Sequence, residues 1–352
     1  MTISKILMEF KNTDSAIKDG RDGRVRQYVK IQDSTAKIKV TTIKSKKNQS
    51  ELLDRYSLAK YDLCPDYVFP EALDGLVPRN TPVYVEGSER YLERLMRALS
   101  IFKQCALIGP SGTGKTHIAY LAAEVAGLPV WEVNCNLQTS VYDLFGRYVG
   151  MGKENWVDGP IVSWARHGGI LCLDEANMMK QDIATRMNPV LDTRGHIVLT
   201  EKDNEIIPRH KFAYVVMSMN PYTNEFVGTK PLNTAFRRRM SVWVNFDYLS
   251  VGTTISQEEV KLVQERTKVN EDIATRIVAV GAELRRRYKD ADLSYGPSVG
   301  DLINWGKIIC YGDTPQSAAE DTIVAITSDK VEVQEIVRQV VNMFFDDQLL
   351  RP

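Results

Sequence analysis

The chain has 352 residues, and its 45 lysines and arginines are balanced by 45 aspartates and glutamates, so the formal net charge at pH 7 is zero. This balance gives no overall electrostatic reason to expect binding to nucleic acid or to a membrane surface. Apolar residues make up 43% of the chain, as is typical of a globular protein. Because the chain is longer than one hydrophobic core usually serves, we expect two or three domains.

Five cysteines occur, at positions 64, 105, 135, 172 and 310, and no two of them form a C-x-x-C pair. This pattern favours a reducing compartment, without a disulfide framework or a zinc site. The first ten residues contain no apolar core of a signal peptide, and the chain has no run of 18 apolar residues. We therefore expect a cytoplasmic protein without a membrane span.

Residues 1–60 are predicted to form a separate basic region. Residues 1–50 contain twelve lysines and arginines against five acidic residues, a net charge of +7. Residues 24–31 and 36–43 alternate apolar with charged side chains around Gln-Asp-Ser-Thr, which predicts a β-hairpin. The charge indicates either a solvated hairpin face or a contact with nucleic acid or a docking partner, and a solvated face needs fewer assumptions.

The most informative stretch is Gly-Pro-Ser-Gly-Thr-Gly-Lys-Thr at residues 109–116. It lies between an apolar run at 105–108 and a helix-like run at 117–125, which is the strand–loop–helix context of a phosphate-binding loop. The backbone N–H groups of such a loop converge on phosphate oxygens, the lysine reaches the β- and γ-phosphates, and the last hydroxyl holds Mg²⁺. The alternative is a tight turn between a strand and a helix. The predicted nucleotide-binding residues are Gly109, Pro110, Ser111, Gly112, Thr113, Gly114, Lys115, Thr116 and His117.

Other elements are predicted from apolar periodicity and from glycine and proline positions. A helix capped by Ser88 is expected at 88–99, ahead of the first strand. Further strands are expected at 130–134, 169–173, 212–219 and 241–246, and two glycine-bounded hairpins at 144–161 and 194–208.

The strand at 169–173 runs directly into Asp174 and Glu175. Beside a phosphate-binding loop, Asp174 can hold Mg²⁺ through water, and Glu175 can polarise the water that attacks the γ-phosphate. The alternative is a strand that ends in solvent with two exposed acids. Asn220 follows the strand at 212–219, where its amide can contact the attacking water or the γ-phosphate, although a lone asparagine there is more often a turn cap.

Three arginines, Arg237, Arg238 and Arg239, end a predicted helix at 232–240. A planar guanidinium suits the γ-phosphate of a nucleotide bound by a neighbouring subunit. The alternative is that these cations only complement the dipole at the end of the helix. One or two of the three suffice for catalysis.

From residue 256 onward the sequence predicts helices only. Ser256 and Glu259 open the first of them in the pattern of a capping box, and further helices are expected at 271–288, 298–310 and 313–345. We therefore expect three domains: a basic β-hairpin region at 1–60, an α/β nucleotide-binding domain at 61–249, and a helical lid at 250–352.

The chain resembles the AAA+ ATPases. More narrowly, it is similar to the MoxR-type branch, which includes the CbbQ and NorQ activators, the cobaltochelatase ATPase subunit and the dynein-related domains. The resemblance covers about residues 65–310, and residues 1–60 lie outside it. The motifs that carry it are GPSGTGKT (109–116), DLFGRY (143–148), GPI (159–161), LDEA (173–176), SMNP (218–221), FRRRM (236–240), NFDYL (245–249) and GPSVGDLINW (296–305).

The resemblance implies an α/β P-loop AAA+ fold, a three-layer sandwich with a five-stranded parallel sheet, followed by a small helical lid. It implies ATP and Mg²⁺ as cofactors and a homo-oligomeric, hexameric ring with ATP at each subunit junction. Arg237 and Arg239 match the arginines that act in trans. The hairpins, at about 147–160 and 194–209, would face the pore or a client, and a von Willebrand A-type protein is a frequent partner.

One departure from the family pattern stands out. Relatives usually place an arginine in the lid two residues after the serine of the Gly-x-Ser motif, where it contacts the γ-phosphate. Here Ser298 is followed by Val299 and Gly300. Two alternatives stay open: either one of Arg285, Arg286 and Arg287 substitutes, or the lid is weakly coupled to the nucleotide.

The leading hypothesis is a Mg²⁺-dependent AAA+ ATPase, with Lys115, Glu175, Asn220, Arg237 and Arg239 as catalytic residues and with Thr116 and Asp174 as metal ligands. It would use ATP hydrolysis to remodel or activate a protein partner. The second hypothesis is a nucleic-acid motor or packaging ATPase, motivated by the basic residues 1–50, although these residues lack interleaved aromatics. The third is an assembly scaffold in which slow hydrolysis only times ring formation.

Overall fold

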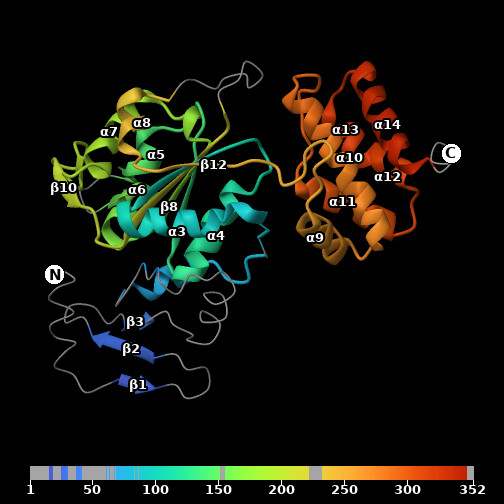
Figure 1. Ribbon diagram of the computed structural model, residues 1–352. Helices are drawn as coiled ribbons and strands as arrows, with labels where there is room; N and C mark the ends of the chain where they lie inside the picture. Colours follow the sequence, from blue (N-terminus) through green and yellow to red (C-terminus); the bar gives the residue numbers. More distant parts are fainter. Residues whose placement is uncertain are drawn as a thin grey trace.

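The computed structural model describes residues 61–150 (except 62, 64–66, 68, 83 and 86), 155–221 and 232–346, together with the backbone of three strands near the N-terminus. These strands pair antiparallel in chain order and are β1 (Ala16–Lys18), β2 (Val25–Lys30) and β3 (Lys37–Thr41) (Figure 1). The pairing of β2 with β3 is the predicted hairpin. The rest of the basic region lies outside the described residues.

A parallel sheet of five strands forms the centre of the larger lobe (Figure 1). The strands follow the order β12 (Trp243–Asn245), β4 (Gln104–Ile108), β11 (Ala213–Met219), β8 (Gly169–Asp174) and β5 (Val130–Asn134). All five were predicted as strands from their apolar runs. Since every neighbouring pair is parallel, the carboxyl ends of the strands lie along one edge of the sheet, called here the carboxyl edge.

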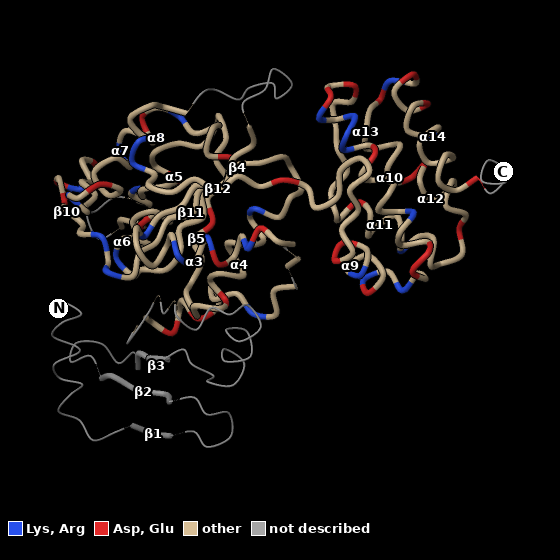
Figure 2. The backbone as a smooth tube through the Cα atoms, viewed as in Figure 1, with Lys and Arg blue, Asp and Glu red and all other residues tan. Residues whose placement is uncertain are grey.

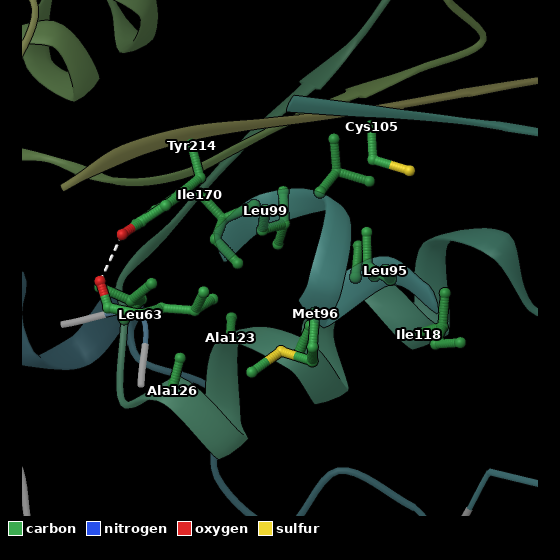
Figure 3. Close-up of a cluster of buried hydrophobic side chains, with 14 of the residues drawn as sticks. Leu63, Leu95, Met96, Leu99, Cys105, Ile118, Ala123, Ala126, Ile170 and Tyr214 are labelled. Atoms are coloured by element: carbon green, nitrogen blue, oxygen red, sulfur yellow. Dashed lines mark hydrogen bonds between the residues drawn. The ribbon is translucent and has the colours of Figure 1, made fainter. Parts of the chain in front are cut away.

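Side chains of the strands alternate between the two faces of the sheet. Cys105 and Leu107 belong to one hydrophobic cluster, together with α3 (Tyr91–Phe102) and α4 (Lys115–Ala126), as Figure 3 shows for part of it. Ala106 belongs to a second cluster on the other face. The helices that carry side chains in this second cluster are α5 (Val141–Phe145), α6 (Pro160–His167), α7 (Gln181–Leu191) and α8 (Thr234–Arg239). The predicted three-layer α/β sandwich is therefore confirmed.

The predicted cap of α3 is wrong. Ser88 lies in a separate 3-10 turn at Gly87–Glu89, and α3 begins only at Tyr91. Arg90 occupies the cap position in the left-handed conformation (φ 53°) and makes no capping hydrogen bond through its side chain. The turn places Ser88 too early in the chain to reach the first free N–H groups of the helix.

Two short antiparallel hairpins interrupt the α/β pattern where the sequence predicts them. The first joins β6 (Gly146–Tyr148) to β7 (Trp156–Asp158), and the second joins β9 (His196–Leu199) to β10 (Glu205–Pro208). Residues 151–154, within the first hairpin, lie outside the described residues.

The second lobe consists of helices and has a hydrophobic cluster of its own, so we call it the lid (Figure 1). Its α-helices are α9 (Gln257–Thr267), α10 (Glu271–Lys289), α11 (Val299–Cys310), α12 (Pro315–Ala319), α13 (Ala325–Thr327) and α14 (Val331–Phe345), and a π-helix spans Glu320–Val324. Charged residues of both signs are interspersed along the helices of both lobes (Figure 2). None of the described helices is long and apolar enough to cross a membrane. The cysteines that the structure describes, at 105, 135, 172 and 310, are free.

Candidate nucleotide-binding site

The glycine-rich loop lies at the carboxyl edge, between β4 and α4. Gly114 is the cap residue of α4 and has a φ of 84°, a left-handed conformation that glycine adopts without strain. A Cβ atom at Gly114 would lie 2.6 Å from the Tyr84 ring, so the close approach of this ring also requires glycine. The loop therefore presents its backbone at the N-terminus of a 12-residue helix, an arrangement that binds anions.

Lys115 is held inside the loop and is only 8% exposed. Its Nζ donates to the carbonyl oxygens of Gly109 at 2.8 Å and Pro110 at 2.6 Å, and to Oδ1 of Asn220 at 3.1 Å. These acceptors account for the three protons of the ammonium group. Burial lowers the pKa of Lys115 to about 8, although the nearby carboxylates of Asp174 and Glu175 oppose the shift.

Asp174 connects the loop to the central strands. The hydroxyl of Thr116 donates to Oδ2 of Asp174 at 2.9 Å. The other carboxylate oxygen accepts from the hydroxyl of Ser218 on β11 and from the backbone N–H of Glu175. Ser218 is fully buried, and sequence reasoning missed its role; the available signal was a polar residue within an apolar strand. The aspartate is thus fixed in orientation from three sides.

Glu175 has a strained backbone and a free side chain. Its φ of 51° is in the left-handed region, which a residue with a Cβ seldom adopts. Such strain is concentrated at functional sites, where it aims a side chain. Within the described part of the structure, the carboxylate has no ion pair or hydrogen-bond partner, and it lines the cavity beside the loop. It is therefore available to accept a proton.

The order of the strands brings Asn220 and Asp174, which follow or end neighbouring strands, to the loop. β11 lies between β4 and β8, so Asn220, at the end of β11, lies between the loop and Asp174. Together they surround an open cavity of about 240 Å³, whose lining residues are Ser111, Gly112, Gly114, Lys115, Thr116, His117, Asp174, Glu175, Met219 and Asn220.

A second cavity, of about 390 Å³, continues from the first between the larger lobe and the lid. Gly112, Gly114 and His117 line both cavities. His117 stacks on the Tyr84 ring, with a centroid distance of 5.8 Å, and the wall opposite is formed by α9 and α11. Tyr84 and Tyr248 line this cavity. Sequence reasoning assigned neither of them a role, because neither belongs to a phosphate-binding motif, although Tyr248 lies within the family motif NFDYL (245–249).

The arginines of α8 lie at the opposite edge of the sheet. The side-chain amide of Gln104, at the amino end of β4, donates to the backbone oxygen of Arg239. Arg237 lies over the ring of Trp243, 4.9 Å from its centroid, and this ring belongs to the first residue of β12. Since β4 has five residues at about 3.3 Å each, the backbone oxygen of Arg239 lies about 16 Å from the loop along the strand. The structure does not bring these arginines to their own loop.

Comparison with known proteins identifies the family. The family described as AAA domain (dynein-related subfamily) matches residues 104–240, and the family CbbQ/NirQ/NorQ C-terminal matches residues 259–344. The denitrification regulatory protein NirQ of Stutzerimonas stutzeri is 31% identical over 239 residues, which cover 67% of this chain and 83% of that protein. NirQ of Pseudomonas aeruginosa is 30% identical over 75% of this chain and 97% of its own length. Protein CbbQ of Hydrogenophilus thermoluteolus is 29% identical over 76% of this chain and 96% of that protein.

The chain belongs to the CbbQ/NirQ/NorQ family of AAA+ ATPases. The prediction of a MoxR-type, CbbQ/NorQ-like protein is confirmed by both family matches and by these relatives. The first cavity, beside the glycine-rich loop, is accordingly the candidate nucleotide-binding site of this P-loop AAA+ protein, and the second cavity extends it toward the lid.

Arg285, Arg286 and Arg287 were the candidates to replace the lid arginine that is absent at Gly300. In this structure each of the three is held in an ion pair within the lid. Arg285 is completely buried and pairs with Glu259 at 2.9 Å. Arg286 is paired with Glu283 and Asp290, and Arg287 with Glu283. Of the two alternatives left open by the sequence, substitution by an arginine of α10 is therefore not observed, because each guanidinium is paired within the lid.

Proposed function

We propose that this protein is a ring-forming AAA+ ATPase that hydrolyses ATP and uses the hydrolysis to remodel or activate a protein partner. The observation that carries the proposal is the convergence of Lys115, Thr116, Asp174, Glu175 and Asn220 around one cavity at the carboxyl edge. Phosphate binding alone requires only the loop. A free carboxylate and an amide beside it are the groups that hydrolysis requires in addition.

In this proposal each residue has a defined task. The loop backbone and Lys115 bind the phosphates, and the Asn220 amide orients water or the terminal phosphate. The Glu175 carboxylate accepts a proton from the attacking water. Arg237 and Arg239 act on the nucleotide of a neighbouring subunit, since α8 lies toward the amino ends of the strands and neither arginine lines the cavity beside its own loop. This last assignment requires a ring, in agreement with the oligomers that AAA+ proteins typically form.

The oxygen atoms of Thr116 and Asp174 fit Mg²⁺. They lie 2.9 Å apart, and both are hard oxygen donors of the kind that Mg²⁺ prefers. Among the described residues, no three His, Cys, Asp or Glu side chains gather into an all-protein metal site. This fits a cation that is held largely by phosphates and water. When bound, Mg²⁺ neutralises charge on the phosphates.

The substitution Glu175→Gln tests the proposal. The variant should bind ATP and assemble as the wild type does, but its turnover should fall at least about 10²-fold because the proton acceptor is lost. Glu271→Gln, at an exposed position in the first turn of α10, is the matched control and should keep normal turnover. Normal turnover in Glu175→Gln would remove the basis for the assignment.

The names of the relatives support a regulatory role. NirQ is called a denitrification regulatory protein. The hairpins expose apolar side chains, including Val149 and Val157 near the first and Ile206 in the second, which suit contact with a protein client. We propose that the protein forms a hexameric ring in the cytoplasm, and that a von Willebrand A-type protein is a candidate partner. We also propose that the chain is divided into domains at 1–60, 61–249 and 250–352.

The alternative, a nucleic-acid motor or packaging ATPase, depends on the net charge of +7 in residues 1–50, of which the structure describes only three strand backbones. The two functions are separated by the ATPase rate with and without DNA or RNA at low and high salt. Strong stimulation that disappears at high salt would favour the motor. Very slow turnover combined with ATP-dependent assembly would favour the third hypothesis, an assembly scaffold in which slow ATP hydrolysis only times ring formation.

A further inference from the structure

The lid touches the phosphate-binding loop directly, through the turn that precedes α11. A Cβ atom placed on Gly112 would lie 2.2 Å from the Cβ of Ser298, so the loop backbone and the turn are in close contact. Gly112 also has a φ of 72°, which favours glycine. Movement of the loop backbone at this point therefore displaces the turn.

One side chain joins the same two segments by hydrogen bonding. The hydroxyl of Tyr248, in the connection between β12 and the lid, lies 3.3 Å from the backbone oxygen of Ser111 and 3.2 Å from that of Gly296. A phenol has a single proton, so these two carbonyls share one donor. Burial raises the pKa of Tyr248, so the hydroxyl keeps its proton and remains a donor.

Arg285 fixes the Tyr248 ring relative to the lid. Its guanidinium lies over this ring, 4.7 Å from the centroid. The same group donates to the backbone oxygen of Pro297 at 2.7 Å and to that of Ser250 at 3.2 Å. Because the Arg285 side chain is 0% exposed and paired with Glu259, it is anchored within the lid. Tyr248 and the turn at 296–298 are thus held by one cation.

We propose that Tyr248, positioned by Arg285, couples the loop to the lid in place of the lid arginine that is absent at Gly300. This inference rests on the proposed function, since it requires that nucleotide binds the loop. When the N–H groups of the loop turn toward phosphate, the Ser111 carbonyl of the same backbone reorients. The Tyr248 hydroxyl then shifts its hydrogen bond between Ser111 and Gly296, and the lid follows. Tyr248 is a positioning residue, because its hydroxyl hydrogen-bonds to the loop backbone and not to the phosphate.

The test compares Tyr248→Phe with Tyr214→Phe in the full-length chain. Each substitution removes one tyrosine hydroxyl that donates to a backbone carbonyl, and the Tyr214 bond to Leu63 lies in the larger lobe, away from the lid (Figure 3). Hydrogen–deuterium exchange is measured with and without a non-hydrolysable ATP analogue, for the loop at 109–116 and for the lid at 296–303. Steady-state kinetics with ATP give kcat and KM.

In the wild type and in Tyr214→Phe, the analogue should slow exchange in both segments. In Tyr248→Phe it should slow exchange in the loop only, and kcat should fall about 10-fold while KM changes by less than about 2-fold. Equal protection of the lid in both variants would overturn the coupling while leaving ATP binding intact. If the analogue does not protect the loop of the wild type, the proposed function fails, and the inference fails with it.

Discussion

The Nζ of Lys115 lies 3.1 Å from Oδ1 of Asn220, so the end of β11 holds the lysine of the loop that follows the neighbouring strand β4. The amide oxygen accepts from the lysine, and the amide N–H groups of Asn220, which have no acceptor among the described residues, can donate into the cavity that both residues line. In the proposed function, this side chain would connect phosphate binding with the orientation of the terminal phosphate or the attacking water.

Replacing Asn220 with alanine should lower kcat by about 10²-fold, because a preorganised donor at the reacting phosphate is lost. KM for ATP should change little, since the loop still binds the phosphates. Steady-state ATPase kinetics provide the measurement. Asn304→Ala, at an exposed position of α11 outside both cavities, is the control. An unchanged kcat in Asn220→Ala would show that the amide takes no part in the reaction.

The contribution of Lys115 to ATP affinity should be constant below about pH 8 and should fall at higher pH. Burial lowers the pKa of Lys115 to about 8, so above that pH the free protein loses this proton and must take it up again on binding phosphate. The expected decrease is up to about 10-fold per pH unit. The same shift makes folding stability rise from about pH 8 toward the ordinary pKa of 10.5, because the cost of burying the charged amine is relieved.

Binding of a fluorescent ATP analogue between pH 6 and 10 measures this dependence. Lys115→Met should bind weakly and lack the decrease above pH 8, which separates the lysine from other groups that titrate. An identical pH profile in both proteins would assign the titration elsewhere.

Arg239 should act across a subunit boundary. Neither Arg239→Ala nor Lys115→Ala should be active alone, but mixed rings should regain part of the activity. In such rings an intact loop lies beside an intact arginine from the neighbouring subunit. Arg238→Ala is the control, because Arg238 is exposed and has no side-chain partner within the described residues. If mixing never restores turnover, the site is not shared, or Arg239 is not the arginine that completes it.

Arg285→Ala should destabilise the lid by about 3–5 kcal/mol, because it leaves Glu259 buried without its cation. Arg286→Ala, on the same helix and in an exposed pair with Glu283, should change the free energy of unfolding far less. Chemical denaturation followed by far-UV circular dichroism compares the two. Equal effects of both substitutions would show that the buried pair does not hold the lid together.

Sequence alone determined the elements that have a strong local signal. The loop at 109–116, the strand-end positions of Asp174, Glu175 and Asn220, and the five strands could be predicted because apolar periodicity and glycine spacing are local properties. The cap of α3 could not be predicted, since it depends on a 3-10 turn ahead of the helix. Glu259 illustrates the limit of such prediction. The sequence pattern placed this acid in the first turn of α9, and Ser256 does cap that helix. The burial of Glu259 against Arg285 depends on tertiary packing, which the pattern does not contain.

What the tertiary structure decided is which of these residues meet. Strand order is a property of the whole sheet, and it places β11 between β4 and β8 so that Asn220 lies beside both the loop and Asp174. The same topology puts the α8 arginines at the far edge of the sheet. The missing arginine at Gly300 was visible in the sequence, but the contacts of Tyr248 and Arg285 join segments far apart in the chain. Such contacts depend on how the lobes pack, and no local pattern of residues encodes them.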